Sequence, residues 1–218
     1  MPTRSTIADI PADGVYLEGS LTLPDRPSGV VIFAHGSGSS RHSPRNTYVA
    51  NTLHEQGIAT LLFDLLTVRE DQDYDNRFNI VLLTTRLLAA TIWVRQQADT
   101  ERLPLGYFGA STGAAAALRA AAAPGNDIAA VVSRGGRPDL AGIEPLERVT
   151  SPTLLIVGGN DEPVISLNEQ AYAHLSCEKK LSIVPGATHL FEEPGTLEQV
   201  AQQAADWFSR WFAVKQTP

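Results

Sequence analysis

The sequence predicts an α/β protein in which helices cover both faces of a mostly parallel sheet. From Val30 to the end of the 218-residue chain, short apolar runs alternate with segments of helical periodicity. The runs are apolar at nearly every position, which is typical of parallel strands buried on both faces. Near the N-terminus, apolar and polar side chains alternate from Val15 to Leu23. This second pattern predicts an antiparallel hairpin at one edge of the sheet.

Each predicted element has a local reason. The apolar runs predict strands at residues 6–10, 15–23, 29–34, 58–63, 103–108, 128–133, 153–157 and 180–184. Turn residues occupy positions 11–14, and acidic and other polar residues make residues 64–76 a predicted loop. Ser43 and Pro44 begin a helix that Gly57 ends. Helical spacing predicts further helices at residues 77–97, 114–123, 165–175 and 196–212, the last with a core-facing stripe of Val200, Ala204, Trp207 and Trp211.

Length and composition favour one soluble domain over residues 1–218. The stretch between Ser133 and Thr153 is too short for a lid domain. A net charge of −7 argues against binding to nucleic acid or to an anionic membrane. Cys177 is the one cysteine, which excludes an internal disulfide and a cysteine-based zinc site. Since no signal peptide or long apolar run is visible, we expect a cytoplasmic protein.

A G-x-S-x-G motif stands between a predicted strand and a predicted helix, at residues 109–113. A sharp turn between a strand and a helix strains its central residue and needs small flanking residues. Gly109 and Gly113 meet this need. The context therefore predicts a nucleophile elbow that presents the Ser111 hydroxyl at the end of the sheet. The alternative is a glycine-rich turn with a capping serine.

A serine nucleophile needs a base and an acid that orients the base. Of the five histidines, His189 alone follows both the elbow and a predicted strand end. Asp161 lies between Ser111 and His189 in the chain, just after the strand at residues 153–157. The order serine, acid, histidine is that of the hydrolase elbow. Glu162 is the fallback for the acid. Asp139 and Glu144 are further candidates for it, but they lie farther from a strand end.

The oxyanion of an acyl-transfer intermediate needs two N–H donors aimed at one point. The N–H of Thr112 is one, at the start of the helix after the elbow. We expect the second from Ser37, in the loop after the first buried strand, where Gly36 and Gly38 allow close backbone approach. A phosphate cradle is the other interpretation of this loop, but the Gly-Lys-Ser/Thr ending of a P-loop is missing.

The chain resembles the α/β-hydrolase superfamily, and within it the small, lidless dienelactone hydrolase-like proteins. The resemblance is carried by residues 35–38, 109–113, 158–161 and 186–189, which are His-Gly-Ser-Gly, Gly-Ala-Ser-Thr-Gly, Gly-Gly-Asn-Asp and Gly-Ala-Thr-His. It implies an α/β-hydrolase fold without a lid domain. Dienelactone hydrolase itself has a cysteine at the elbow, whereas this chain has Ser111. The departure favours a general carboxylic-ester hydrolase.

Other side chains near the predicted strand ends are candidates for substrate contacts. His35 and Arg41 belong to the loop after the first buried strand, and Arg134 follows the strand at residues 128–133. Arginine recognises carboxylate and phosphate groups, so Arg134 is the better candidate for an anion at the pocket rim. Solvent-facing arginines are the alternative interpretation, above all for Arg41 and Arg137.

The sequence therefore predicts a serine esterase that acts on small esters with short acyl chains. The triad Ser111, His189 and Asp161 needs neither a metal nor an organic cofactor. The same groups would serve a peptidase, a perhydrolase, or a lactone or thioester hydrolase. A catalytically silent binding protein of the same fold is the alternative from another class. The sequence does not address the oligomeric state.

Overall fold

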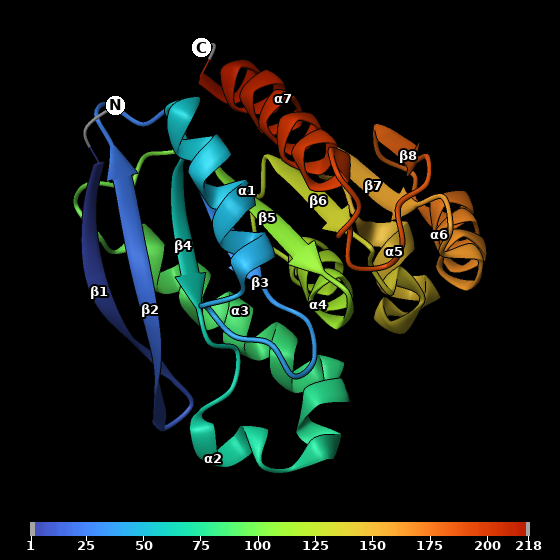
Figure 1. Cartoon of the computed structure of the whole chain (residues 1–218). Coiled ribbons are helices and arrows are strands. Elements are labelled where there is room, and N and C mark those ends of the chain that lie inside the picture. The colour runs from blue at the N-terminus through green and yellow to red at the C-terminus, as the bar shows by residue number, and fades with distance from the viewer. Residues whose placement is uncertain (1–2, 217–218) are drawn as a thin grey trace.

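One eight-stranded sheet organises the molecule, for which a computed structural model describes residues 3–216 (Figure 1). The strands are β1 (Thr3–Ala12), β2 (Val15–Pro24), β3 (Val30–Ala34), β4 (Ala59–Phe63), β5 (Leu105–Ala110), β6 (Ala130–Arg134), β7 (Thr153–Gly158) and β8 (Lys179–Val184). Their order across the sheet is β1-β2-β4-β3-β5-β6-β7-β8. The six strands β4, β3, β5, β6, β7 and β8 pair in parallel in this order. In contrast, β1 pairs with β2, and β2 with β4, in antiparallel fashion. The predicted fold class and the edge hairpin are confirmed.

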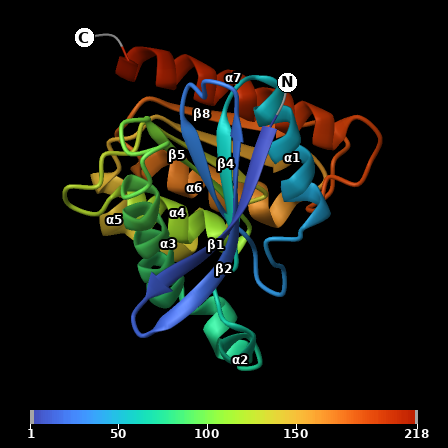
Figure 2. The same cartoon turned by 90° about the vertical axis from the view of Figure 1, so that its left-hand side faces the viewer.

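Helices pack on both faces of this sheet. They are α1 (Pro44–Glu55), α2 (Val68–Asp71), α3 (Ile80–Arg95), α4 (Thr112–Ala121), α5 (Ile143–Arg148), α6 (Glu162–His174) and α7 (Thr196–Gln216), with 3-10 turns η1 (Tyr74–Phe78) and η2 (Pro138–Ala141). In Figure 2 the hairpin faces the viewer, with α1 on one side of the sheet and α3 and α4 on the other. Between β6 and β7 the chain forms only η2 and α5, so the part of the chain that is described has no lid domain.

The core is divided by the sheet because successive strand residues point to opposite faces. In β3, Val31 and Phe33 pack with α1 and α7, and Phe33 lies 4.9 Å from the Phe108 ring, centroid to centroid. The alternate residues Val30 and Ile32 pack toward α3 and α4. All five β3 residues are buried, which explains why the run is apolar without alternation.

The hairpin turn is tighter than the sequence predicts. Residues 11–14 are expected to form the turn, but β1 runs through Pro11 and Ala12, and only Asp13 and Gly14 connect the strands. Both turn residues have positive φ, 44° and 80°, which matches the twist of a two-residue hairpin. Pro11 is tolerated because β1 is an edge strand with one side free of pairing.

The segment of residues 64–76 was expected to be a loop and is partly helical. Thr67 caps α2 through a capping box, in which its hydroxyl accepts from the Glu70 N–H and the Glu70 carboxylate accepts from the Thr67 N–H. The next helix, α3, begins at Ile80 rather than at residue 77, because the Asn79 side chain caps it by accepting from the Leu82 N–H. The helix α5 was not predicted at all. No helix among residues 3–216 is long and apolar enough to cross a bilayer.

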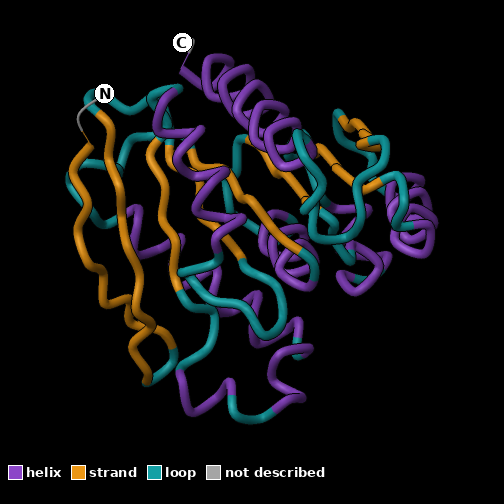
Figure 3. Tube along the Cα trace, in the orientation of Figure 1, coloured by secondary structure: helices purple, strands orange, loops and turns teal. Residues whose placement is uncertain are grey.

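The loops that follow β3, β5, β6, β7 and β8 lie at one end of the sheet, since these neighbouring strands run in parallel (Figure 3). Parallel α/β sheets bind their ligands beyond the carboxyl ends of the strands. These loops contain the candidate catalytic residues predicted from the sequence, so the candidate site lies at this end of the molecule.

Candidate active site

Ser111 occupies a strained turn between β5 and α4. Its backbone has φ 50° and ψ −121°, a region that a residue with a side chain rarely adopts. Such a conformation costs of order 1–3 kcal/mol and is held only when the surroundings enforce it. Here the Ser111 N–H donates to the Arg134 carbonyl at 3.3 Å, and the Ser111 carbonyl accepts from the Arg137 N–H at 3.0 Å. The loop after β6 therefore holds the turn.

The two glycines of the motif allow the elbow to close. A Cβ atom at Gly109 would lie 2.5 Å from the Cα of Ala114 in α4. A Cβ atom at Gly113 would overlap the backbone carbonyls of Ala34 and His35 at the end of β3. The absence of both side chains lets α4 start directly against β5 and β3. Ser111 is thereby placed beside Gly36, where a Cβ would lie 3.0 Å from the Ser111 Cβ.

His189 and Asp161 form a pair at the neighbouring strand ends. Asp161 follows β7 at the start of α6, and His189 lies in the loop between β8 and α7. The Nδ1 atom of His189 lies 2.7 Å from Oδ2 of Asp161, whose side chain is 13% exposed. When Nδ1 donates its proton to this carboxylate, Nε2 is left as the basic nitrogen. Glu162, the fallback for the acid, becomes the first residue of α6 and has no recorded bond to His189.

Ser111 and His189 line one pocket of about 260 Å³. The other lining residues are Gly36, Ser37, Ser39, Ser43, Arg45, Asn46, Ala110, Arg134 and Leu190. The two side chains share this space without a direct hydrogen bond. Gly135, with φ 51°, lets the loops approach, because a Cβ there would lie 3.1 Å from the His189 carbonyl oxygen.

The two predicted oxyanion donors belong to the residue that follows Ser111 and to the loop after β3. Thr112 is the first residue of α4, where helix N–H groups lack an intrahelical acceptor and the helix end carries partial positive charge. Ser37 lies in the loop after β3 and lines the pocket with Ser111. Gly38 has φ 67° and completes a turn in which the Ser39 N–H donates to the Gly36 carbonyl at 3.2 Å.

His35 has a different environment from the one expected of a substrate contact. Its side chain is buried, Nδ1 lies 2.9 Å from the carbonyl of Gly36, and Nε2 accepts from the Leu65 N–H at 3.0 Å. Burial lowers the pKa of this imidazole, which favours the neutral form. Both ring nitrogens are used by the backbone, so His35 joins the loop after β3 to the loop after β4 and has no free nitrogen for a ligand.

Arg41 and Arg134 are separated by the structure. Arg41 binds Asp64 through its side chain and its N–H, and reaches Glu18 at 2.6 Å, away from the pocket. Arg41 is therefore not among the residues that line the pocket with Ser111. Arg134 lines the pocket, and its Nη2 donates to Oδ1 of Asn46 at 3.3 Å. Burial, together with the charge of Arg45, lowers the pKa of Arg134 to about 10.

Arg45 and Asn46 belong to the pocket lining and were not singled out from the sequence. Both lie in the first turn of α1, which Ser43 caps by accepting from the Asn46 N–H at 3.4 Å. The Ser43-Pro44 start signal predicts where α1 begins, and a helix that begins beside the loop after β3 must direct its first turn toward that loop. This is the signal from which the two residues could have been found. Within residues 3–216 no group of three or more metal-binding side chains gathers.

The strained serine, the paired histidine and the strand-end loops form a candidate active site, and comparison with known proteins shows the family. Residues 27–213 match the family model described as an alpha/beta hydrolase domain. The crystal structure of a dienelactone hydrolase from Anabaena variabilis is 52% identical, covers 96% of this chain and 98% of its own, and superposes with a TM-score of 0.92. The chain belongs to the α/β hydrolase family and is dienelactone hydrolase-like.

Further relatives extend the comparison. Est1E from Butyrivibrio proteoclasticus shares the fold, with a TM-score of 0.81 at 19% identity over 95% of this chain and 99% of its own. A Mycobacterium tuberculosis protein named as a putative phosphoribosyl transferase is 58% identical over 207 residues, which are 95% of this chain and 46% of that protein. The chain thus spans about half the length of the curated relative that it matches.

Proposed function

We propose that this protein hydrolyses carboxylic esters through an acyl-enzyme formed on Ser111. The observation that carries the proposal is the joint placement of a strained Ser111 and a carboxylate-paired His189 in one pocket. A serine hydroxyl is a weak nucleophile until a base removes its proton. His189 has its Nε2 available for that role, since Nδ1 faces Asp161.

The reaction proceeds in two halves. Ser111 Oγ attacks the ester carbonyl while His189 takes its proton, and the Thr112 and Ser37 N–H groups stabilise the oxyanion. His189 then protonates the leaving alcohol, and an acyl-enzyme remains. Water, activated by the same imidazole, attacks the acyl group and regenerates Ser111. Asp161 fixes the orientation of His189 and stabilises the imidazolium in both halves.

The pocket indicates the size of the substrate. A volume of about 260 Å³ lies below the range of typical drug-sized ligand sites, roughly 300–1,000 Å³. The described chain has no lid domain that would add an apolar channel. Short acyl groups are therefore preferred over long lipid chains.

Hydrolysis of p-nitrophenyl esters from acetate to laurate tests the proposal, with Ser111→Ala measured beside the wild-type protein. We expect turnover that falls with acyl length and drops at least about 10⁴-fold in the variant, as when a triad serine is removed. Equal turnover in the two proteins would contradict the assignment of Ser111 as the nucleophile. Circular dichroism of both proteins controls for folding.

A second candidate is hydrolysis of a lactone or a thioester, for which the same groups suffice. The observation in its favour is the 52% identity to a dienelactone hydrolase over 96% of this chain. Parallel assays with a γ-lactone, a thioester and an open-chain ester of equal size rank the three bonds by kcat/KM. A folded protein inactive on all three would instead support a non-catalytic binding role.

A further inference from the structure

The pocket beside Ser111 is positively charged although the chain as a whole has a net charge of −7. Two of its lining residues, Arg45 and Arg134, are arginines, and none of the lining residues is acidic. The remaining polar lining includes Asn46 and the hydroxyls of Ser37, Ser39 and Ser43. Such a lining can donate several hydrogen bonds to a negatively charged group and contains no carboxylate that would repel it.

Arg134 is a buried cation without a counter-ion. Its side chain belongs to a residue that is 6% exposed, yet among residues 3–216 it forms no ion pair, and its Nε has no hydrogen-bond partner. Its one recorded acceptor is the neutral amide of Asn46. The Nε of Arg86 is likewise buried without a partner, but Arg86, at 4% exposure, has the counter-ion that Arg134 lacks, because it pairs with Glu70 at 2.7 Å and also donates to the Ala12 carbonyl.

A buried charge normally carries a partner, since taking an ion out of water is costly unless it is paired. Arg86 follows this rule and Arg134 does not. The cost is increased by Arg45, whose charge together with burial lowers the pKa of Arg134. An anion entering the pocket would supply the missing partner.

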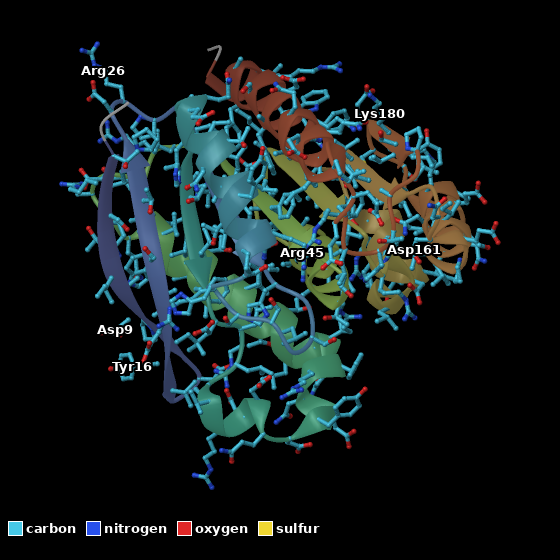
Figure 4. All side chains as sticks on the ribbon, viewed as in Figure 1. Asp9, Tyr16, Arg26, Arg45, Asp161 and Lys180 are labelled. Carbon is cyan, nitrogen blue, oxygen red and sulfur yellow. The ribbon has the colours of Figure 1, made fainter. Side chains whose placement is uncertain are left out.

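The first turn of α1 adds to this preference. It contains Arg45 and Asn46 and no acidic residue, and the start of a helix favours negative charge. The nearest recorded anion is Glu192, which lies 3.4 Å from Arg45 and is 66% exposed. Figure 4 shows Arg45 at this end of α1, on the side of the molecule toward Asp161. Arg45 is thus only weakly compensated.

We infer that this pocket binds an ester whose own structure includes an oxyanion, either a carboxylate or a phosphate, which Arg134 and Arg45 hold while Ser111 attacks. The inference deepens the proposed function and rests on it for the ester bond. Binding of the anion, however, requires only the pocket. It can therefore be tested in protein that does not turn over.

The binding test uses the Ser111→Ala protein and two simple probes, succinate and inorganic phosphate. We expect each probe that binds to raise the melting temperature at constant ionic strength, relative to sodium chloride. The increase is lost when Arg134→Met is added, and reduced when Arg45→Gln is added. Tighter binding of one probe in calorimetry identifies the oxyanion as a carboxylate or a phosphate.

Arg26→Gln is the matched control, because it removes one positive charge far from the pocket (Figure 4). It should leave the anion-dependent increase unchanged. An increase that persists in both the Arg134→Met and Arg45→Gln proteins, or no increase with either probe, would overturn the inference. Because Arg45 is 30% exposed, its variant remains informative if Arg134→Met does not fold.

The kinetic test compares monomethyl succinate with methyl butyrate, a neutral ester of similar length. We expect wild-type protein to prefer the acidic ester, and Arg134→Gln to reduce the acidic-to-neutral ratio of kcat/KM by about tenfold or more, mainly through KM. An unchanged ratio would contradict the inference. If no ester is hydrolysed but both probes still bind in an Arg134-dependent way, the anion site stands and the proposed ester hydrolysis fails.

Discussion

At the scale of single residues, some polar side chains at the carboxyl end of the sheet have hydrogen-bond partners of matching charge, and others do not. Asp161 and His189 satisfy each other, and His35 is satisfied by two backbone groups. Arg134 has only a neutral acceptor. Satisfied groups hold the loops in place, whereas the unsatisfied cation and the strained Ser111 retain the capacity to interact with a ligand.

His35 makes stability depend on pH. Its folded-state pKa is lowered by burial, while an unfolded histidine titrates near 6.5. Below about pH 6.5 the unfolded chain therefore binds more protons than the folded chain, so the free energy of unfolding falls as pH falls. The loss ends once the folded histidine is protonated, which also breaks its bond from the Leu65 N–H.

Urea unfolding between about pH 7 and pH 5 measures this dependence in wild-type protein and in His35→Asn. We expect a shallower slope in the variant. His54, whose pKa burial also lowers, leaves a part of the slope in place. Equal slopes of the unfolding free energy against pH in the two proteins would mean that the pKa of His35 does not differ between the folded and unfolded states.

At the scale of elements, the strands and the elbow could be predicted because their signals are local. The continuous apolar run of β3, the glycines around Ser111, and the Ser43-Pro44 start of α1 each act within a few residues. Two of the errors occur where a single capping residue decides. Asn79 starts α3 three residues later than its periodicity suggests, and Thr67 turns a polar loop into α2.

The placement of the candidate site residues at one end of the sheet was predictable for a similar reason. The order of residues along parallel strands brings Ser111, Asp161 and His189 to one end of the sheet, so their neighbourhood follows from topology. Contacts that depend on the direction of a side chain could not be predicted from this topology. Arg41 was expected at the substrate and instead pairs with Asp64, and Arg45 was overlooked although it lines the pocket.

Gly113→Ala tests the close approach of α4 to β3. The added methyl would meet the carbonyls of Ala34 and His35, so we expect a loss of more than about 3 kcal/mol in unfolding free energy, together with loss of hydrolysis. Gly125→Ala is the control, because Gly125 has φ 73° and open space around it. Backbone strain alone should cost about 1–2 kcal/mol there. Similar losses in urea unfolding for both variants would contradict the packing argument.

At the scale of the whole molecule, the sheet acts as a frame that joins loops distant in sequence. Five loop segments meet at one end of the sheet: residues 35–46, 109–113, 134–137, 158–161 and 186–190. The hairpin β1–β2 forms one edge of the sheet and contributes no residue to the pocket. The 207 aligned residues make up 46% of a curated relative, so a segment similar to this chain is also found within a longer protein. The proposed function requires that this frame presents an activated serine, Ser111.

Labelling with a fluorophosphonate, followed by peptide mass spectrometry, tests that claim most directly. The account predicts one adduct, on Ser111, in the wild-type protein, since only an activated hydroxyl attacks the reagent. It also predicts much slower labelling in Asp161→Asn, in which His189 loses the carboxylate at 2.7 Å from its Nδ1. A folded protein that is not labelled, or is labelled at another serine, would contradict the assignment of Ser111 as the nucleophile.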